Sequence, residues 1–453
     1  MTTTPELISA RLRSPDYRAW RAQVEATGGC AQPIRLAGSS TVLDPDGAPL
    51  IEHDGEILAP CGNRRASVCP ACSDRYAADA FHLLRAGLAG DTSKDVPDSV
   101  ADRPRAFLTL TAPSFGPVHT RKVTGRGFVV PCRCGQRHHP DDPRVGCALD
   151  PATYDYTGAV LWQAHAGKLW ARFTTTLRRA LATVLGVPAR EFRDHARLSY
   201  AKVADYQRRG LVHFHAVIRL DGPDGPAAPC PAALNHATLR DAVTHAAGAT
   251  ALTVARPDRT ALTLGWGTQI DLRPVTPSAA RQIETDTGEM SDTALAGYIA
   301  KYATKATGAI NGAARPIRDL DHVQYLDLTP HHRTMIETAW TLGELEQYDG
   351  LNLRRWAHML GFRGHFLTKS QRYSTTFRAI RAEERRWRLR QDLAALDTDP
   401  NGHTIDPDSV VVINDWVPVR FGHRDDAERE LATAIAERNR AQRRSKATST
   451  RRG

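Results

Sequence analysis

The chain has 453 residues, 41% hydrophobic and 24% charged, so it can bury a large core and form two or three domains. Its 60 Lys and Arg outnumber its 50 Asp and Glu, and the resulting net charge of +10 favours an anionic partner such as nucleic acid. It contains no run of about eighteen apolar residues and begins without the basic and apolar regions of a signal peptide. These features exclude a membrane-spanning protein and predict a cytoplasmic one.

Cysteines cluster in residues 1–90, which we expect to form an N-terminal zinc-binding module. Cytoplasmic thiols stay reduced, so grouped cysteines there more often bind metal than form disulfides. Cys69 and Cys72 form a CxxC pair, and a tetrahedral zinc site needs four ligands. The predicted ligands are Cys30, Cys61, Cys69 and Cys72. Arg64 and Arg65, within the same cluster, are available for DNA phosphates.

A second cluster lies in a loop-like insertion at residues 117–155, after a predicted strand at Phe107-Leu108-Thr109-Leu110-Thr111. Its CxC spacing is less diagnostic than CxxC, and the sequence does not choose between His138 and its neighbour His139. The second candidate zinc site consists of Cys132, Cys134, His138 and Cys147.

A long amphipathic helix is predicted from Gly158 to Leu185, followed by two strands, 198–206 and 211–220, joined by a hairpin turn. Arg208 and Arg209 in that turn are candidate DNA contacts. Because side chains alternate along a strand, His213 and His215 project from the same face. Two imidazoles so placed can ligate one metal ion, although a strand with two surface histidines would look the same.

Further along, a helix is predicted from about 233 to 247 and a strand from 262 to 275, before a helical segment that contains Tyr298 and Tyr302. These tyrosines share a helix face, with Lys301 and Lys305 on or beside it. Cationic neighbours lower the cost of a phenolate, so this grouping favours a nucleophilic tyrosine. The structural alternative is a packing pair whose hydroxyls reach water.

The Phe107 strand, the His213-Phe214-His215 strand and the Tyr298-Ile299-Ala300-Lys301-Tyr302 helix, in this order, resemble the motifs of the HUH endonucleases. Among these, the chain is similar to rolling-circle replication initiators of actinobacterial plasmids and integrative elements. Stretches such as Ala357-His358-Met359-Leu360-Gly361 add to the likeness, which extends from about residue 28 to about residue 385.

The resemblance implies an α+β protein with the HUH endonuclease fold, in which helices cover a central antiparallel sheet. It would carry an N-terminal zinc-binding module and a helical C-terminal region. The expected parts are residues 1–90, a nicking and joining domain at 105–310, a helical DNA-binding or accessory region at 315–400, and a basic, partly disordered tail at 401–453.

The resemblance also implies a mechanism. A catalytic Mn²⁺ or Mg²⁺ would be bound by His213 and His215, with Asp205 as the expected third ligand if the hairpin register allows it. A tyrosine would nick one strand of a single-stranded or hairpin origin, and Tyr302 is the expected primary nucleophile. A host helicase and polymerase would then be partners, whereas zinc would be structural.

The sequence is also compatible with two alternatives. A conjugative relaxase shares the metal and tyrosine chemistry, but relaxases usually place their tyrosines before the histidines. A zinc-containing DNA-binding protein without nuclease activity would show the same clusters and charge.

Overall fold

The computed structural model describes residues 3–276, 290–291, 295–300, 316–396 and 405–449. The chain forms two compact units, one of residues 1–80 and 376–453 and the other of residues 81–375. The first unit therefore combines the two ends of the chain, which the sequence interpretation had assigned to separate parts. The long helix α3 (Pro70–Ala89) begins in the first unit and ends in the second.

The first unit is built on an antiparallel sheet in the order β13-β1-β2. Its core contains Trp20 and Val24 of α2 together with Ile435 of α12. Besides the start of α3, its elements are α1 (Thr4–Arg13), α2 (Tyr17–Ala26), β1 (Ile34–Leu43), β2 (Pro49–Ala59), α11 (Phe377–Ala395), β13 (Val411–Phe421) and α12 (Asp426–Ser449).

Strand β13 lies within residues 401–453, which the sequence predicts to be a basic, partly disordered tail. It pairs with β1 from Ile34↔Phe421 to Leu43↔Val411. Its valine-rich, β-branched composition suits a strand, and among the described residues its pairing partner is the distant β1.

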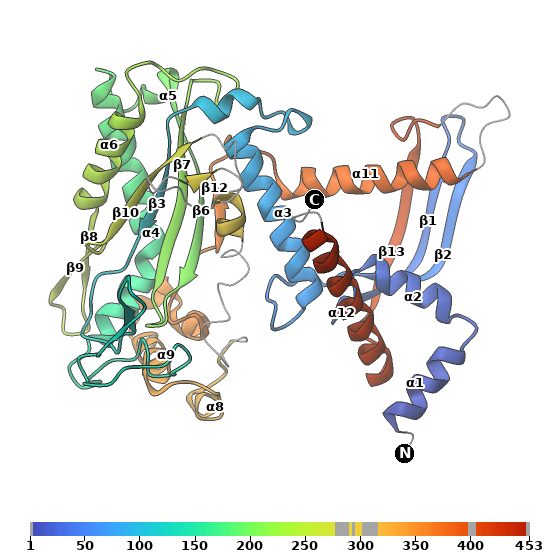
Figure 1. The fold of residues 1–453 in the computed structure, drawn as a ribbon, viewed down its shortest axis with the longest axis horizontal. Helices are drawn as coiled ribbons and strands as arrows, with labels where there is room; N and C mark the ends of the chain where they lie inside the picture. The colour runs from blue at the N-terminus through green and yellow to red at the C-terminus, as the bar shows by residue number, and fades with distance from the viewer. Residues whose placement is uncertain (1–2, 277–289, 292–294, 301–315, 397–404, 450–453) are drawn as a thin grey trace. The chain divides into compact units, whose positions relative to one another are not determined.

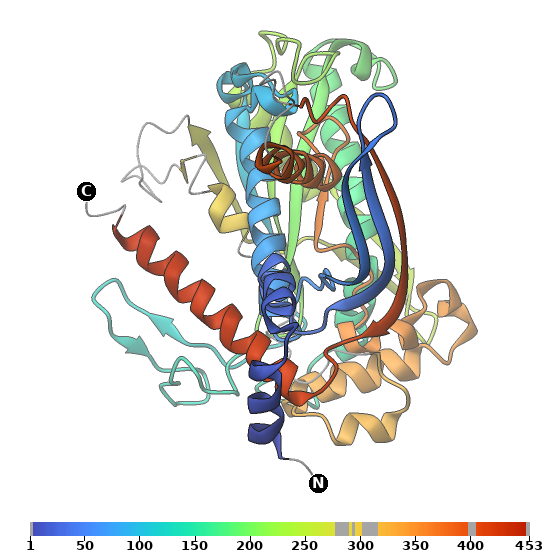
Figure 2. The ribbon, with the colours of Figure 1, turned by 90° about the vertical axis from the view of Figure 1, so that its right-hand side faces the viewer.

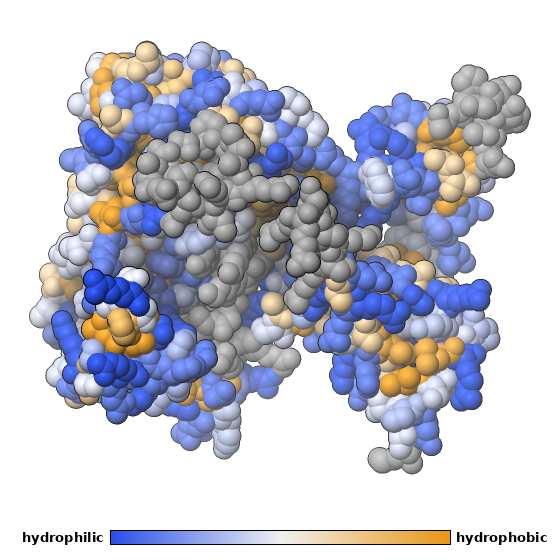
Figure 3. Space-filling model, in the orientation of Figure 1, coloured by the Kyte–Doolittle hydropathy of each residue, from blue (hydrophilic) through white to orange (hydrophobic). Residues whose placement is uncertain are grey.

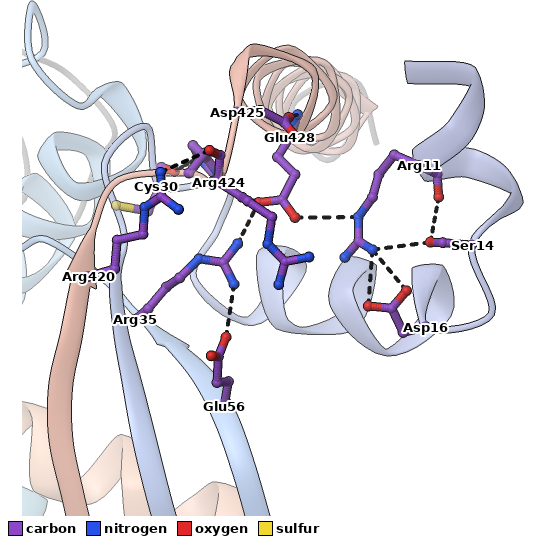
Figure 4. Close-up of polar contacts among 11 residues, drawn as sticks. Arg11, Ser14, Asp16, Cys30, Arg35, Glu56, Arg420, Arg424, Asp425 and Glu428 are labelled. Carbon is purple, nitrogen blue, oxygen red and sulfur yellow. Dashed lines mark hydrogen bonds and ion pairs between the residues drawn. The ribbon is translucent and has the colours of Figure 1, made fainter. Parts of the chain in front are cut away.

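A buried ion-pair network links helices and strands of the first unit (Figure 4). Glu428 of α12 is 1% exposed and pairs with Arg35 of β1 and Arg11 of α1. Arg35 also contacts Glu56 of β2 at 3.3 Å. Because a buried charge is costly unless it is paired, this network holds the chain termini against the sheet.

The second unit centres on a sheet whose order, within the described residues, is β11-β10-β3-β7-β6-β12. Its long strands are antiparallel, and β7 lies between β3 and β6. The sheet strands are β3 (Arg105–Leu110), β6 (Arg197–Tyr206), β7 (Val212–Asp221), β10 (Ile270–Thr276), β11 (Met290–Ser291) and β12 (Leu367–Lys369).

Helices, 3-10 turns and two hairpins surround the central sheet of the second unit. Within the described residues its helices include α4 (Tyr156–Val184), α5 (Phe192–His195), α6 (His236–Ala249), α8 (Leu320–Gln324), α9 (Pro330–Leu342) and α10 (Leu353–Trp356), besides the helical residues 295–300. Its 3-10 turns are η1 (Thr92–Lys94), η2 (Asp98–Asp102), η3 (Glu346–Leu351) and η4 (Ala357–Met359). Two hairpins stand apart from the central sheet: β4 (Lys122–Val123) with β5 (Val129–Val130), and β8 (Ala251–Ala255) with β9 (Ala261–Gly265).

Helices α4 and α6 cover one face of the central sheet (Figure 1). On that face Phe214 of β7 packs edge-on against Trp170 of α4. Strand alternation then turns His213 and His215 to the opposite face, next to the helical residues 295–300. The fold is thus mixed α/β with antiparallel sheets, as expected, and its helices lie on both faces of the central sheet.

The predicted hairpin and long helix are confirmed as β6, β7 and α4. The predicted strand 262–275 is instead two strands, because the chain turns after Gly265 and the Gly267 N–H donates to the Thr111 carbonyl. Of the region 315–400, the described residues 316–396 are mostly helical, but they also contribute β12 to the sheet edge. No helix among the described residues is long and apolar enough to cross a membrane.

Candidate functional site

The register of the β6–β7 hairpin places Asp205 directly opposite His213. The carboxylate Oδ2 of Asp205 lies 3.2 Å from Nε2 of His213, and Asp205 is 6% exposed. Residues paired across antiparallel strands point to the same face, so Asp205 joins the two histidines. Asp205 is the third metal ligand expected from the sequence, and the strand register places it beside the two histidines.

His215 is buried beneath the same face, with 3% of its surface exposed. Its ring stacks on Phe107 at 5.7 Å, and its Nδ1 lies 3.1 Å from the hydroxyl of Thr109. An Nδ1–H that donates to Thr109 leaves Nε2 as the ligand atom. Burial, reinforced by His213, lowers the pKa of His215 to about 3. The imidazole is therefore neutral at physiological pH, which is the form that binds metal.

Asp205, His213 and His215 each offer a ligand atom within 4.8 Å of the others. The ring centroids of the two histidines are 4.3 Å apart. One carboxylate and two imidazoles on one rigid strand pair could hold a divalent cation and leave coordination positions open for a ligand.

Tyr298 lies beside this group. Its ring centroid is 5.6 Å from that of His215 and 5.9 Å from that of Phe107, both edge-on. Ile299 and Ala300 are buried, whereas Tyr298 is half-buried and faces the histidines. The other candidates in this motif, Lys301, Tyr302 and Lys305, lie outside the described residues.

The four cysteines predicted to form the first cluster come together in the first unit. Cys30 Sγ lies 3.7 Å from Cys69 Sγ and 3.6 Å from Cys72 Sγ, and Cys61 Sγ is 3.7 Å from Cys72 Sγ. A tetrahedron with metal–sulfur bonds of about 2.3 Å has sulfur atoms about 3.8 Å apart. These separations fit one metal ion and are far too long for a disulfide.

Backbone N–H groups support the same reading of the cysteine cluster. The amides of Ala31 and Cys61 each point at a cluster sulfur from 3.3 Å, as expected around thiolates. Hydrogen bonds from Cys30 and Cys72 lower the pKa of Cys69, and the thiolate is the form that binds metal.

The second cluster differs from its predicted composition. The structure gathers His119, Cys132, Cys134 and His138 within 4.8 Å of one another. Cys147 is not in this group, and its Sγ instead lies 3.4 Å from the Pro143 carbonyl. His119 was missed because it precedes the cysteines by more than ten residues, and only the intervening hairpin brings it back.

The candidate DNA-binding arginines occupy different environments. Arg209 is half-buried and donates to the carbonyls of Ala112 and Pro113, so its guanidinium braces the β6–β7 turn. Arg208 in the same turn is exposed. Arg64 and Arg65 are half-buried in the loop between the cysteines of the first cluster.

The fold and the site define a mixed α/β protein with a histidine–aspartate group at the centre of an antiparallel sheet and separate clusters of metal-ligating side chains. Over residues 16–437 the chain matches the family model RepSA, described as "Replication initiator protein, pSAM2". It is 46% identical over 445 residues to a replication initiator protein of Streptomyces ambofaciens, covering 96% of this chain and 93% of that protein. The chain therefore belongs to the RepSA family of replication initiator proteins. No solved structure matches it.

Proposed function

We propose that the protein is an HUH endonuclease that starts rolling-circle replication by nicking one origin strand and later rejoining it. The observation that carries this proposal is the position of Tyr298 beside the group formed by Asp205, His213 and His215. A nucleophile next to a candidate cation site is the arrangement that phosphoryl transfer requires.

In the proposed nicking step, a tyrosine hydroxyl releases its proton to water and its oxygen attacks the scissile phosphorus in line. A P–O(Tyr) bond forms and the bond from phosphorus to the 3′ oxygen breaks. The electron pair leaves with that oxygen, which takes up a proton. The products are a 5′-phosphotyrosine link and a free 3′-hydroxyl from which a polymerase extends.

Asp205, His213 and His215 would hold Mn²⁺ or Mg²⁺, and their fit rests on the neutral, buried His215 and the opposed carboxylate. The bound cation would polarise the phosphate and offset charge that develops during attack. Imidazole ligands favour Mn²⁺ over Mg²⁺, which prefers oxygen. Thr109 would hold the His215 ring in orientation.

Two tyrosines four residues apart would support a complete cycle. One would stay linked to DNA while the other cleaves the regenerated origin, and the released 3′-hydroxyl would then attack the first link and close a circle. Tyr302 remains the proposed primary nucleophile, with Tyr298 as the second. Lys301 and Lys305 would stabilise the phenolates.

The remaining proposed roles follow from this function. Cys30, Cys61, Cys69 and Cys72 would hold a structural zinc ion, in agreement with their tetrahedral sulfur separations. Arg64, Arg65 and Arg208 would contact DNA phosphates. The protein would act on a single-stranded or hairpin origin in the cytoplasm, with a host helicase and polymerase.

Covalent adduct formation tests the proposal. The purified chain is incubated with labelled single-stranded DNA from its own replicon in Mn²⁺, and the adduct is resolved under denaturing conditions and mapped by mass spectrometry. We expect an adduct on Tyr302 or Tyr298 that disappears on chelation and in His213→Ala. Tyr325→Phe, which changes an 86% exposed tyrosine, is the matched control and should keep the adduct.

An adduct that persists in a Tyr298→Phe, Tyr302→Phe double variant would remove both tyrosines from the mechanism. DNA binding without any adduct would favour a zinc-containing DNA-binding protein. A relaxase would instead act at a transfer origin and not at a replication origin.

A further inference from the structure

The second Cys/His cluster has the dimensions of a tetrahedral zinc site. His119 Nδ1 lies 3.3 Å from His138 Nε2, and Cys134 Sγ lies 3.3 Å from the same Nε2. With zinc bonds of about 2.0–2.1 Å to nitrogen and about 2.3 Å to sulfur, a tetrahedron predicts separations of about 3.3 Å and 3.6 Å. Cys132 Sγ, 4.0 Å from His119 Nδ1, completes the set.

The surroundings of the cluster also suit a metal site. His138 is 3% exposed, and its Nδ1 lies 2.8 Å from Asp142 Oδ2, which would orient the ring and leave Nε2 for a metal. The amide of Thr120 lies 3.4 Å from Cys132 Sγ. Two sulfur and two nitrogen ligands at these distances point to zinc and not to a hard cation.

These ligands flank a short hairpin on both sides. His119 precedes β4, whereas Cys132 follows β5. Strands of two residues are too short to be stable alone, so a metal that joins their two ends would act as a staple. Arg137 reinforces the base by donating from Nε to the Val129 carbonyl at 3.0 Å.

The hairpin tip presents an aromatic side chain to solvent. Phe128 is 71% exposed, although hydrogen bonds between Thr124 and Phe128 close the loop at 2.9 and 3.1 Å. Val123 and Val130 beside it are 46% and 40% exposed. A hydrogen-bonded loop that displays a large apolar ring to solvent suits a partner with a flat aromatic surface.

The charge around this ring is positive. Residues 117–147 contain two acidic residues, Asp141 and Asp142, and Asp142 pairs with Arg144. Figure 3 shows an apolar group ringed by hydrophilic residues at the lower left, where Figure 1 draws this segment. The basic residues are Arg121, Lys122, Arg126, Arg133, Arg137 and Arg144.

The segment that carries the second Cys/His cluster packs against the β6–β7 turn, which leads into the strand with His213 and His215. Gly146 packs so closely on Arg208 that an added Cβ would lie 2.5 Å from the Arg208 carbonyl carbon. The Ala148 amide lies 3.4 Å from Nδ1 of His331, whose Nε2 contacts the Arg209 carbonyl. Figure 2 shows the hairpin projecting from the end of the sheet at which the β6–β7 turn lies.

We infer that residues 117–149 form a zinc-stapled module that grips single-stranded DNA, with Phe128 stacking on an unpaired base and the surrounding Lys and Arg binding phosphates. Aromatic stacking beside positive charge is how proteins bind single strands without sequence preference. The inference deepens the proposed function, because the module would hold the strand next to the candidate nicking centre.

Zinc content tests whether the second Cys/His cluster binds a zinc ion. Metal analysis of the full chain should show that Cys134→Ser loses one zinc equivalent relative to the wild type. Cys147→Ser, which changes a nearby thiol outside the group, should lose none. Equal zinc content in Cys134→Ser and wild type would overturn the assignment of the ligands.

Binding to a fluorescent mixed-sequence single-stranded oligonucleotide tests the DNA contact. Phe128→Ala should raise Kd by about tenfold, whereas Tyr325→Ala, at another exposed aromatic residue, should leave it unchanged. Lys122→Gln should reduce the log–log salt dependence of Kd by about 0.7. Both substituted side chains are exposed, and a thermal unfolding curve checks that each variant folds.

Unchanged Kd in Phe128→Ala would refute the stacking role. Neither measurement requires catalysis, so a failure of this inference is distinguishable from a failure of the proposed function, which would show as a missing covalent adduct.

Discussion

Lys202 is buried on the reverse face of the histidine-bearing hairpin, and replacing it should stabilise the protein. Lys202 is 4% exposed. Its Nζ lies 3.9 Å from the ring centroid of Phe214 and 5.6 Å from that of Trp170. Burial lowers the pKa of Lys202 from 10.5 to about 7. The folded protein therefore disfavours the ammonium form that the unfolded chain keeps up to a much higher pH.

The magnitude follows from proton linkage. Between the two pKa values the unfolded chain binds more protons than the folded one, so stability rises with pH and falls as the pH is lowered toward 7. The free energy of unfolding should therefore rise by about 3 kcal/mol from about pH 7 to about pH 9.5. Lys202→Met keeps the aliphatic volume and removes the amine. At about pH 7 it should stabilise the protein by up to about 4 kcal/mol.

Urea unfolding, followed by tryptophan fluorescence at these two pH values, measures the effect because Trp170 packs at the site. The free energy of unfolding of the wild type should rise with pH, so that its difference from that of Lys202→Met becomes smaller. If the difference in unfolding free energy between the two proteins stayed constant with pH, burial would not lower the pKa of Lys202. A uniform loss of stability would show that the contact with Phe214 outweighs desolvation.

Three other perturbations test the architecture. Glu428→Gln should cost about 3–5 kcal/mol in chemical denaturation, because it leaves the buried Arg35 without its main partner. Cys72→Ser should remove one zinc equivalent and make the first unit sensitive to protease, whereas Cys230→Ser, outside the described ligand groups, should do neither. Retained zinc in Cys72→Ser would refute the ligand set. Gly146→Ala should lower Tm, since φ is +97° and the new Cβ would meet the Arg208 backbone, at a cost of about 1–3 kcal/mol. Gly135→Ala, at φ +84° with open space, should cost less, and equal losses would contradict the packing argument.

The local chemistry of the site could be predicted from the sequence because it depends on short-range geometry. Alternation along a strand alone places His213 and His215 on one face, and the CxxC spacing of Cys69 and Cys72 alone indicates a metal knuckle. The predicted hairpin and helix α4 were confirmed because their hydrophobic periodicity is strong.

Relations between distant segments required the tertiary structure. Asp205 reaches His213 only because the β6–β7 turn sets that register, and a shift by one residue would turn its carboxylate to the other face. Strand β13 looked like part of a tail because pairing with β1 is a contact across most of the chain.

The second Cys/His cluster depends both on local sequence and on the tertiary structure. The sequence by itself indicated Cys132 and Cys134 as candidate metal ligands by type and spacing, with a histidine beside them, but it did not choose between His138 and His139. Only the folded hairpin decided that His119, and not Cys147, completes the group, because ligand choice depends on where the backbone returns in space. The same hairpin exposes Phe128, since a loop with few neighbours has no core in which to bury an aromatic ring.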